Sequence, residues 1–245
     1  MNGADLGGAI SALQDEVSVG IADTYDLLLQ AYQLRYQVYC VERGFLTGQN
    51  GVELDEYDDF ARHVVVRCRQ TGMVIGTVRL VLPKDSSGGD DFPIQHVCDP
   101  ALLRNLPRDT IGEVSRFALP KLQRQQLRNM SASTCALLRL ALIKGAVRLS
   151  AEAGHTHWLA VMEPTLLRLL GATGIHFEPL GPPVEYHGLR QPAVAELVPT
   201  MARLRDERPI VWEYVTKGGT WFSPLRKQSR RAERSAPALA DAMAA

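Results

Sequence analysis

The apolar residues that follow position 23 recur at the spacing of a helix. They lie three or four positions apart and therefore share one face: Leu27, Leu28, Ala31, Leu34 and Val38. Asp23 or Thr24 can cap the first turn, and we expect this helix to end near Gly44. Residues 1–22 are small and polar-leaning, and we expect a loose leader or a short helix there.

The pattern then changes to that of strands. HVVVRCR (63–69) and MVIGTVRLVLP (73–83) flank the turn residues Gln70-Thr71-Gly72, which predicts a hairpin. Gly76 can mark a bulge in its second strand. GEVSRFAL (112–119) predicts another strand, which ends at Pro120. Strict alternation along it puts Glu113, Ser115 and Phe117 on one face and Val114, Arg116 and Ala118 on the other.

The second half of the chain alternates helices and strands. Helical periodicity from about 131 to 153 stops at Gly154. The strand HTHWLAVM follows, then a short helix that starts at Pro164, then strand segments as far as Val198. The predicted fold class is therefore α+β, with a central, mixed and mostly antiparallel sheet flanked by helices. We assign 23–225 to this domain and expect the basic, Ala-rich tail 226–245 to be disordered.

Composition restricts the class of partner. The chain is 46% hydrophobic and 22% charged, and its net charge of zero gives no reason to expect a nucleic acid. The charges are nevertheless unevenly distributed, because residues 114–151 include seven basic side chains and no acidic one. Such a stretch is either a docking surface for an anionic partner or a solvated helix face.

The sequence gives little indication of a metal site or of a membrane-spanning segment. The four cysteines are widely spaced, and His155 and His157 have no third ligand nearby, so we expect neither a metal nor a bound cofactor. No run of 18 apolar residues and no signal peptide is present. We therefore expect a cytoplasmic protein without a transmembrane segment.

Charged residues occur inside or beside the predicted apolar elements. They are Arg35, with Tyr39 four residues later, Asp55 and Asp58 around Tyr57, Arg79, and Glu113 with Arg116. Buried charges are costly unless they are paired. These residues therefore form either structural ion pairs or the wall of a cleft, and the strand mates Ser115 and Phe117 favour a cleft at Glu113.

Four of these segments together resemble a known family. LRYQVYCVERGFL (34–46), ELDEYDDFARH (53–63), GTVRLVLP (76–83) and GEVSRFALPK (112–121) are similar to the PEP-CTERM/exosortase-associated acyltransferases. That family is regarded as N-acyl amino acid synthases. It is similar to the acyl-homoserine-lactone (autoinducer) synthases, and both belong to the GNAT-like superfamily. The resemblance covers roughly residues 24–225 and implies a GNAT-like N-acyltransferase fold.

The resemblance also implies site residues. It implies that the acidic segment folds over the first helix and pairs with the arginines, and that the glutamate strand borders the thioester site. On that strand we assign catalysis to Glu113 and Ser115. To substrate binding we assign further residues that match the family's motifs: Arg35, Tyr39, Asp55, Asp58, Arg79, Arg116 and Phe117. Two departures change the expected substrates. Gly44-Phe45 stands where the autoinducer synthases have tryptophan, which favours an amino acid acceptor. The phosphate loop R-x-x-G-x-G is missing, which favours a carrier-bound acyl group over acyl-CoA.

The resulting hypothesis is acyl transfer from acyl carrier protein or CoA to the amine of an amino acid, with Glu113 as general base. Ser115 would donate a hydrogen bond or protonate the leaving thiolate. Lys121, Arg124 and Arg128 would dock the acidic carrier protein. Two alternatives stay open: an acyl-homoserine-lactone synthase that uses S-adenosylmethionine, and a non-catalytic module that binds an acyl carrier.

Overall fold

The computed structural model describes residues 3–84, 91–120 and 132–222. Within these ranges the strands form one sheet in the order β1-β2-β3-β4-β5-β8-β6, and β7 pairs with β8. The strands are β1 (Val17–Ile21), β2 (Ala61–Cys68), β3 (Val74–Val81), β4 (Ile111–Ala118), β5 (His157–Met162), β6 (Glu178–Pro179), β7 (Val184–Glu185) and β8 (Leu189–Glu196). The pair β4–β5 is parallel and the other pairs are antiparallel. The predicted mixed, mostly antiparallel sheet is confirmed.

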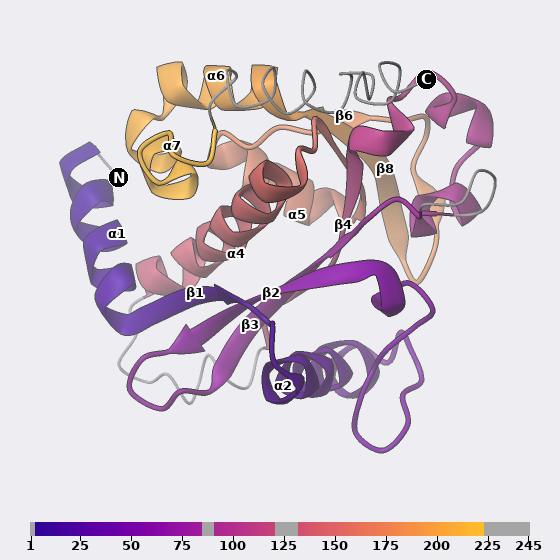
Figure 1. The fold of residues 1–245 in the computed structure, drawn as a ribbon, viewed down its shortest axis with the longest axis horizontal. Coiled ribbons are helices and arrows are strands. Elements are labelled where there is room, and N and C mark those ends of the chain that lie inside the picture. The colour runs from indigo at the N-terminus through magenta and orange to yellow at the C-terminus, as the bar shows by residue number, and fades with distance from the viewer. Residues whose placement is uncertain (1–2, 85–90, 121–131, 223–245) are drawn as a thin grey trace, which may run out of the picture.

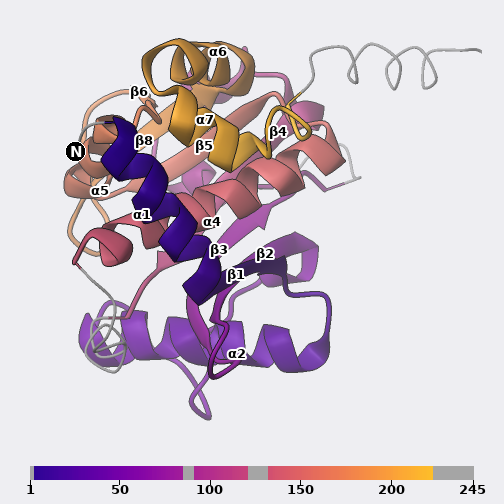
Figure 2. The same cartoon turned by 90° about the vertical axis from the view of Figure 1, so that its left-hand side faces the viewer.

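Helices cover both faces of the sheet (Figures 1 and 2). On one face lies α2 (Tyr25–Arg35), and on the other the long α4 (Ala132–Ala153) with α1 (Gly3–Glu16) and α7 (Pro209–Thr216). Thr24 caps α2, since its Oγ accepts the Leu27 N–H at 3.3 Å. The apolar face of α2 packs on Val65 and Val74. On the other side, α4 packs on Val64, Val66 and Leu80 in the largest core cluster.

The N-terminal segment belongs to this core, so the loose leader predicted for 1–22 is wrong for the part that the structure describes. Helix α1 buries Ile10 and Leu13, and β1 pairs antiparallel with β2. The sequence pattern did not indicate this packing, because small residues interrupt the apolar face of α1. Strand β1 forms because it pairs with β2. The alternative of a helix is confirmed for Gly3–Glu16, whereas neither alternative included the strand Val17–Ile21.

The hairpin of β2 and β3 is confirmed, and so is an irregularity beside Gly76, where the register shifts between Val66 and Arg67 of β2. A second shift lies between Thr77 and Arg79 of β3, where β4 has one residue too many. Arg116 occupies this bulge with φ +50°. The bulge reverses the faces that follow it: Phe117 packs in the α4-side core, whereas Ala118 packs under α2.

The prediction that Arg116 faces away from Ser115 is therefore wrong. Strict alternation fails at a bulge because two successive residues stand opposite one residue of the partner strand. Arg116 consequently joins Glu113 and Ser115 on the α2 side of the sheet, and Phe117 leaves it.

The short helix predicted from Pro164 is confirmed as α5 (Pro164–Ala172). The sequence pattern did not predict α6 (Leu197–Glu207) and α7, which follow β8. Leu197, Met201 and Leu204 are buried at helical spacing on α6, which the interpretation of 191–198 as strand material obscured. The predicted disordered tail 226–245 lies outside the described residues. Of the helices in the described ranges, none combines the length and apolar character needed to cross a bilayer.

Candidate active site

The two parallel strands in the middle of the sheet pair over only part of their length. Their register runs from Ile111 opposite His157 to Glu113 opposite Leu159. Strand β4 continues to Ala118 and β5 to Met162, with no further pairing between these two described strands. A cavity of about 320 Å³ lies at this point and is lined by both strands. That volume is within the range of small-molecule sites.

Glu113 is the last paired residue of β4 before the cavity, which it lines. Its side chain is 1% exposed, and its Oε2 accepts the Ile94 N–H at 2.9 Å from the short helix η3 (Pro93–His96). Burial raises the pKa of Glu113 to about 7, against the opposing effects of the Ile94 hydrogen bond and the positive charge of Arg79. Phe117, which was predicted to share a face with Glu113, packs instead against the core on the other face of the sheet. A carboxyl group with such a pKa can both hold and accept a proton near neutral pH.

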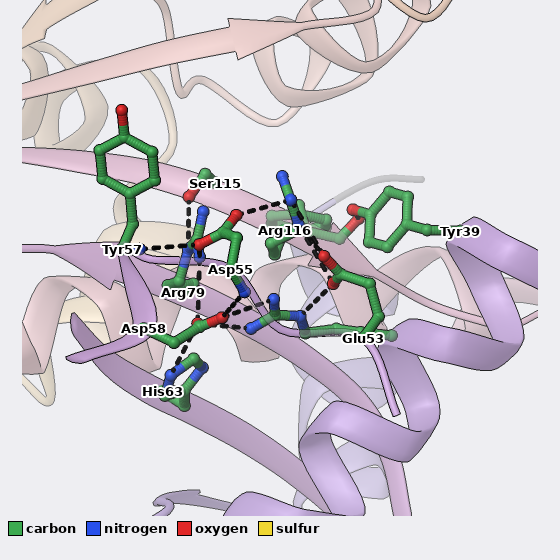
Figure 3. Close-up of polar contacts among 11 residues, drawn as sticks. Tyr39, Glu53, Asp55, Tyr57, Asp58, His63, Arg79, Ser115 and Arg116 are labelled. Atoms are coloured by element: carbon green, nitrogen blue, oxygen red, sulfur yellow. Dashed lines mark hydrogen bonds and ion pairs between the residues drawn. The ribbon is translucent and has the colours of Figure 1, made fainter. Parts of the chain in front are cut away.

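Figure 3 shows a network of six charged side chains, of which Arg116 also lines the cavity. Arg35 donates to both oxygens of Asp58 at 2.7 and 2.9 Å and to Glu53 at 2.6 Å. Arg79 contacts Asp55 and Asp58, and Arg116 contacts Glu53 and Asp55. Three guanidinium groups thus face three carboxylates, and the network is electrically neutral. The implied pairing of the acidic segment with the arginines is confirmed.

Electrostatics keep this network ionised. Burial alone would raise the pKa of Asp58, but the hydrogen bonds and charge of Arg35, together with Arg79, hold it well below its usual range. Burial and the charge of Arg35 lower the pKa of His63 to about 4, so this histidine is neutral at pH 7. Neutral His63 adds no fourth positive charge beside Asp58.

The network contacts two residues of the cavity wall, Ser115 and Arg116. Arg79 Nε donates to Ser115 Oγ at 3.0 Å, and Arg116 follows Ser115 in the bulge of β4 (Figure 3). Both Ser115 and Arg116 line the cavity. Through Arg79 and Arg116, the acidic segment therefore holds the bulged part of β4 in place.

Tyr39 reaches the same wall from an unusual helical segment. Residues Tyr36–Glu42 form a π-helix that continues α2, and Arg43 N–H donates to Val38 O five residues back. Such segments frequently occur at functional sites. The Tyr39 hydroxyl donates to Phe117 O at 3.2 Å, and the Arg116 guanidinium lies 5.7 Å from the centre of the Tyr39 ring. Tyr39 thus fixes the backbone just after the bulge.

The residues predicted for the site separate into three groups. Five line the cavity: Tyr39, Glu113, Ser115, Arg116 and Phe117. Four others are part of the supporting network and are not among the lining residues: Arg35, Asp55, Asp58 and Arg79. The proposed docking residues Lys121, Arg124 and Arg128 lie outside the described residues. For the network residues, direct contact with a substrate remains a prediction.

Sequence reasoning missed Glu53, which is 3% exposed and pairs with both Arg35 and Arg116. The available signal was its place in ELDEYDD, two residues before Asp55, together with three strand or helix arginines that needed three carboxylates.

A second charged cluster on the cavity wall was also missed. It consists of Arg43, Glu163 and Arg190, which come from three distant parts of the chain and meet beside Phe45. We call these four residues the rim cluster. No local motif joins them, so only the fold brings them together.

Comparisons with known proteins show which domains and folds this chain is similar to. Residues 34–132 match the family model described as Acetyltransferase (GNAT) domain. The solved structure of the AHL synthase LasI is similar, with 20% identity, 73% of this chain and 88% of that chain covered, and a TM-score of 0.56. The CoA-dependent acyl-homoserine lactone synthase BjaI has 23% identity, 78% and 88% coverage, and a TM-score of 0.57.

A third similar structure is FeeM, an N-acyl amino acid synthase from uncultured soil microbes. It has 12% identity, covers 76% of this chain and 93% of that chain, and has a TM-score of 0.58. No curated protein matches the sequence. Residues 34–132 are therefore similar to GNAT acetyltransferase domains, and the chain has the fold of these synthases.

Proposed function

We propose that this protein is an N-acyltransferase that moves a long-chain acyl group from a thioester to the amine of an amino acid. The observation that carries this proposal is Glu113, a buried carboxyl group with a pKa near 7 at the point where β4 and β5 separate into a cavity. An amine is protonated at neutral pH and must lose a proton before it can attack a thioester. A carboxylate with a pKa near 7 is suited to accept that proton.

The remaining parts of the reaction have candidates on β4. The tetrahedral intermediate needs hydrogen-bond donors for its oxyanion, and the bulge at Arg116 leaves one residue of β4 outside the regular pairing with β3. Ser115 lines the cavity, and its Oγ already accepts from Arg79. The hydroxyl proton of Ser115 is therefore directed away from Arg79, and the hydroxyl group can donate a hydrogen bond to the thioester sulfur. Loss of an oxyanion donor costs about 10²-fold or more in rate.

The donor would be an acyl carrier protein or CoA. The missing phosphate-loop motif supports the carrier protein, and Lys121, Arg124 and Arg128 would dock its acidic surface. The link to PEP-CTERM/exosortase systems rests on the four sequence motifs and stays a prediction.

Mass spectrometry of lipid extracts from an expressing bacterium tests the proposal. We expect N-acyl amino acids from the wild type, a loss of about 10²–10⁴-fold in Glu113→Gln, and no loss in Glu178→Gln, which changes an exposed glutamate. Undiminished product from Glu113→Gln would assign the base to another group.

The autoinducer synthase reaction is the second candidate, because two of the similar structures carry it out by name. Feeding labelled S-adenosylmethionine and labelled free amino acids in parallel separates the two. Label that enters a lactone product only from S-adenosylmethionine would replace our proposal. If the protein is instead a non-catalytic carrier-binding module, no product forms and Glu113→Gln leaves carrier binding intact.

A further inference from the structure

The rim cluster joins two guanidinium groups to a single carboxylate oxygen. Arg43 Nη1 lies 2.8 Å from Glu163 Oε1, and Arg190 Nη1 lies 3.6 Å from the same atom. The two guanidinium carbons lie 5.6 and 5.2 Å from the centre of the Phe45 ring. All four residues line the cavity that Glu113 also lines.

The charges of the rim cluster differ from those of the buried network. Two arginines and one glutamate leave a charge of +1, whereas the network behind β4 is neutral. The two arginine side chains are 39% and 13% exposed, so the positive charge is reachable from the cavity. A ligand with one negative charge would complete the cluster.

Arg190 is held in place before any ligand arrives. Its Nη2 donates to His187 O, and its Nη1 donates to Leu189 O at 3.2 Å. His187 has φ +50° and Gly188 has φ +90°, and together they form the tight turn from β7 into β8. A guanidinium held in this way loses less side-chain entropy on binding, which favours recognition of a carboxylate.

We propose that Arg43 and Arg190 bind the α-carboxylate of the acyl acceptor. This inference rests on the proposed function and deepens it, because it requires the acceptor to be an α-amino acid with a free carboxylate rather than a simple amine. In this arrangement the carboxylate of the acceptor lies at the rim cluster. The amine of the acceptor points toward β4, where Glu113 accepts the amine proton. S-adenosylmethionine is also an α-amino acid, so both candidate acceptors share this chemistry.

The phosphates of CoA are the competing ligand for a positive cavity wall. CoA carries a diphosphate and a 3′-phosphate, whose total charge is several times the +1 of the cluster. Glu163 contacts both arginines and repels any anionic ligand, but the repulsion is larger for multiply charged phosphates than for one carboxylate, whose single charge matches the excess. The cluster therefore favours a monocarboxylate.

Isothermal titration with two probes tests the inference without requiring turnover. N-dodecanoylglycine and N-dodecanoylglycinamide, both used below their micelle concentrations, differ only in the carboxylate. We expect the wild type to bind the carboxylate about 10- to 100-fold more tightly, since a hydrogen bond to a charged group contributes about 1.5–3 kcal/mol. Arg43→Gln and Arg190→Gln should reduce this preference to about twofold or less. Arg43→Lys, which keeps the charge but loses the fork, should restore part of it.

Arg203→Gln is the matched control, because Arg203 also pairs with a glutamate, Glu207, on the exposed surface of α6. It should keep the full preference. Equal affinity of the wild type for both probes, no binding of either, or an unchanged preference in Arg43→Gln and Arg190→Gln overturns the inference. Displacement of N-dodecanoylglycine by adenosine 3′,5′-bisphosphate, which carries phosphates of CoA, would reassign the cluster to the donor and also overturn it.

The outcomes for the two proposals are separable. N-acyl amino acids in the lipid extracts without any preference in the titration would sustain the proposed function and refute the carboxylate site. A clear preference in the titration without any N-acyl product would sustain the carboxylate site and refute the proposed function.

Discussion

Removal of one carboxylate from the buried network should destabilise the fold strongly. The Asp58 side chain is 4% exposed and accepts from Arg35 at 2.7 and 2.9 Å, from Arg79 at 3.0 Å and from the Asp55 N–H at 2.8 Å. Asp58→Asn keeps the shape of the side chain but removes one of three negative charges. The network then carries a charge of +1 among side chains that water barely reaches, and the asparagine NH₂ meets guanidinium N–H groups.

The magnitude follows from the burial of the two arginines. Arg35 and Arg79 side chains are both fully buried, and loss of one partner from a buried ion pair costs about 3–5 kcal/mol. For a domain of this size, 1 kcal/mol corresponds to about 2–4 °C in Tm. We therefore expect Asp58→Asn to lower the free energy of unfolding by about 3 kcal/mol or more and Tm by about 10 °C.

Urea unfolding at pH 7, followed by far-UV circular dichroism, measures this difference as a shift of the midpoint at constant slope. Asp59→Asn, at the exposed neighbouring position, should stay within about 0.5 kcal/mol of the wild type. A loss of less than about 1 kcal/mol in Asp58→Asn would refute the claim that the network stabilises the fold through compensated charge.

The pH dependence gives a second check on the same variant. The pKa of Asp58 is depressed in the folded state, so its contribution is fully present above the pKa of the unfolded chain, near 3.9, and is lost as the pH falls toward the folded pKa. The difference between the wild type and Asp58→Asn should therefore be constant from pH 7 to about 5 and shrink below about 4. A difference that stays unchanged in acid would point to shape rather than charge.

Three further predictions follow from other parts of the fold. The pKa of Glu113 is raised from 4.5 to about 7, so the folded state favours the neutral form and wild-type stability falls as the pH rises through this range. Glu113→Gln should therefore be more stable than the wild type by up to about 3 kcal/mol at pH 8 and show no gain at pH 4.5. Thermal melts of both proteins at the two pH values measure this difference. For the wild-type reaction, kcat/KM should rise with pH through an apparent pKa near 7, and a profile that is flat between pH 6 and 8 would exclude Glu113 as the base. A Cβ on Gly145 of α4 would overlap Val64 of β2, so Gly145→Ala should lower the free energy of unfolding by about 1–3 kcal/mol. Gly8 lies at an exposed position in the middle of α1 with nothing near its Cβ, so Gly8→Ala should instead stabilise by about 0.5–1 kcal/mol. Equal effects of the two substitutions in thermal melts would contradict the close packing of α4 on the sheet.

Local patterns in the sequence determined most of the elements. The cap at Thr24, the turn at Gly72 and the stop at Gly154 depend on nearby residues alone, and each lies where the sequence predicted it. The period of the apolar residues also identified α4 and the hairpin β2–β3, because a buried helix face and a buried strand have different repeats. The pairing of the acidic segment with three arginines was likewise expected, because charges inside apolar elements need partners.

Some features followed only from tertiary packing. Helix α7 consists largely of residues with high strand propensity, and it is a helix because it packs on α4 and α1. Strand β1 exists because it pairs with β2. Neither result could be obtained from the periodicity of its own segment.

The candidate site shows the same division. The sequence identified Glu113, Ser115 and Arg116 on one strand, but the bulge that turns Arg116 toward the acidic segment depends on the register between β3 and β4. Arg43, Glu163 and Arg190 meet only after the chain has folded, since 120 positions separate the first two. Periodicity is a property of neighbours along the chain, whereas a bulge and a cluster of distant charges depend on how separate elements fit together in space.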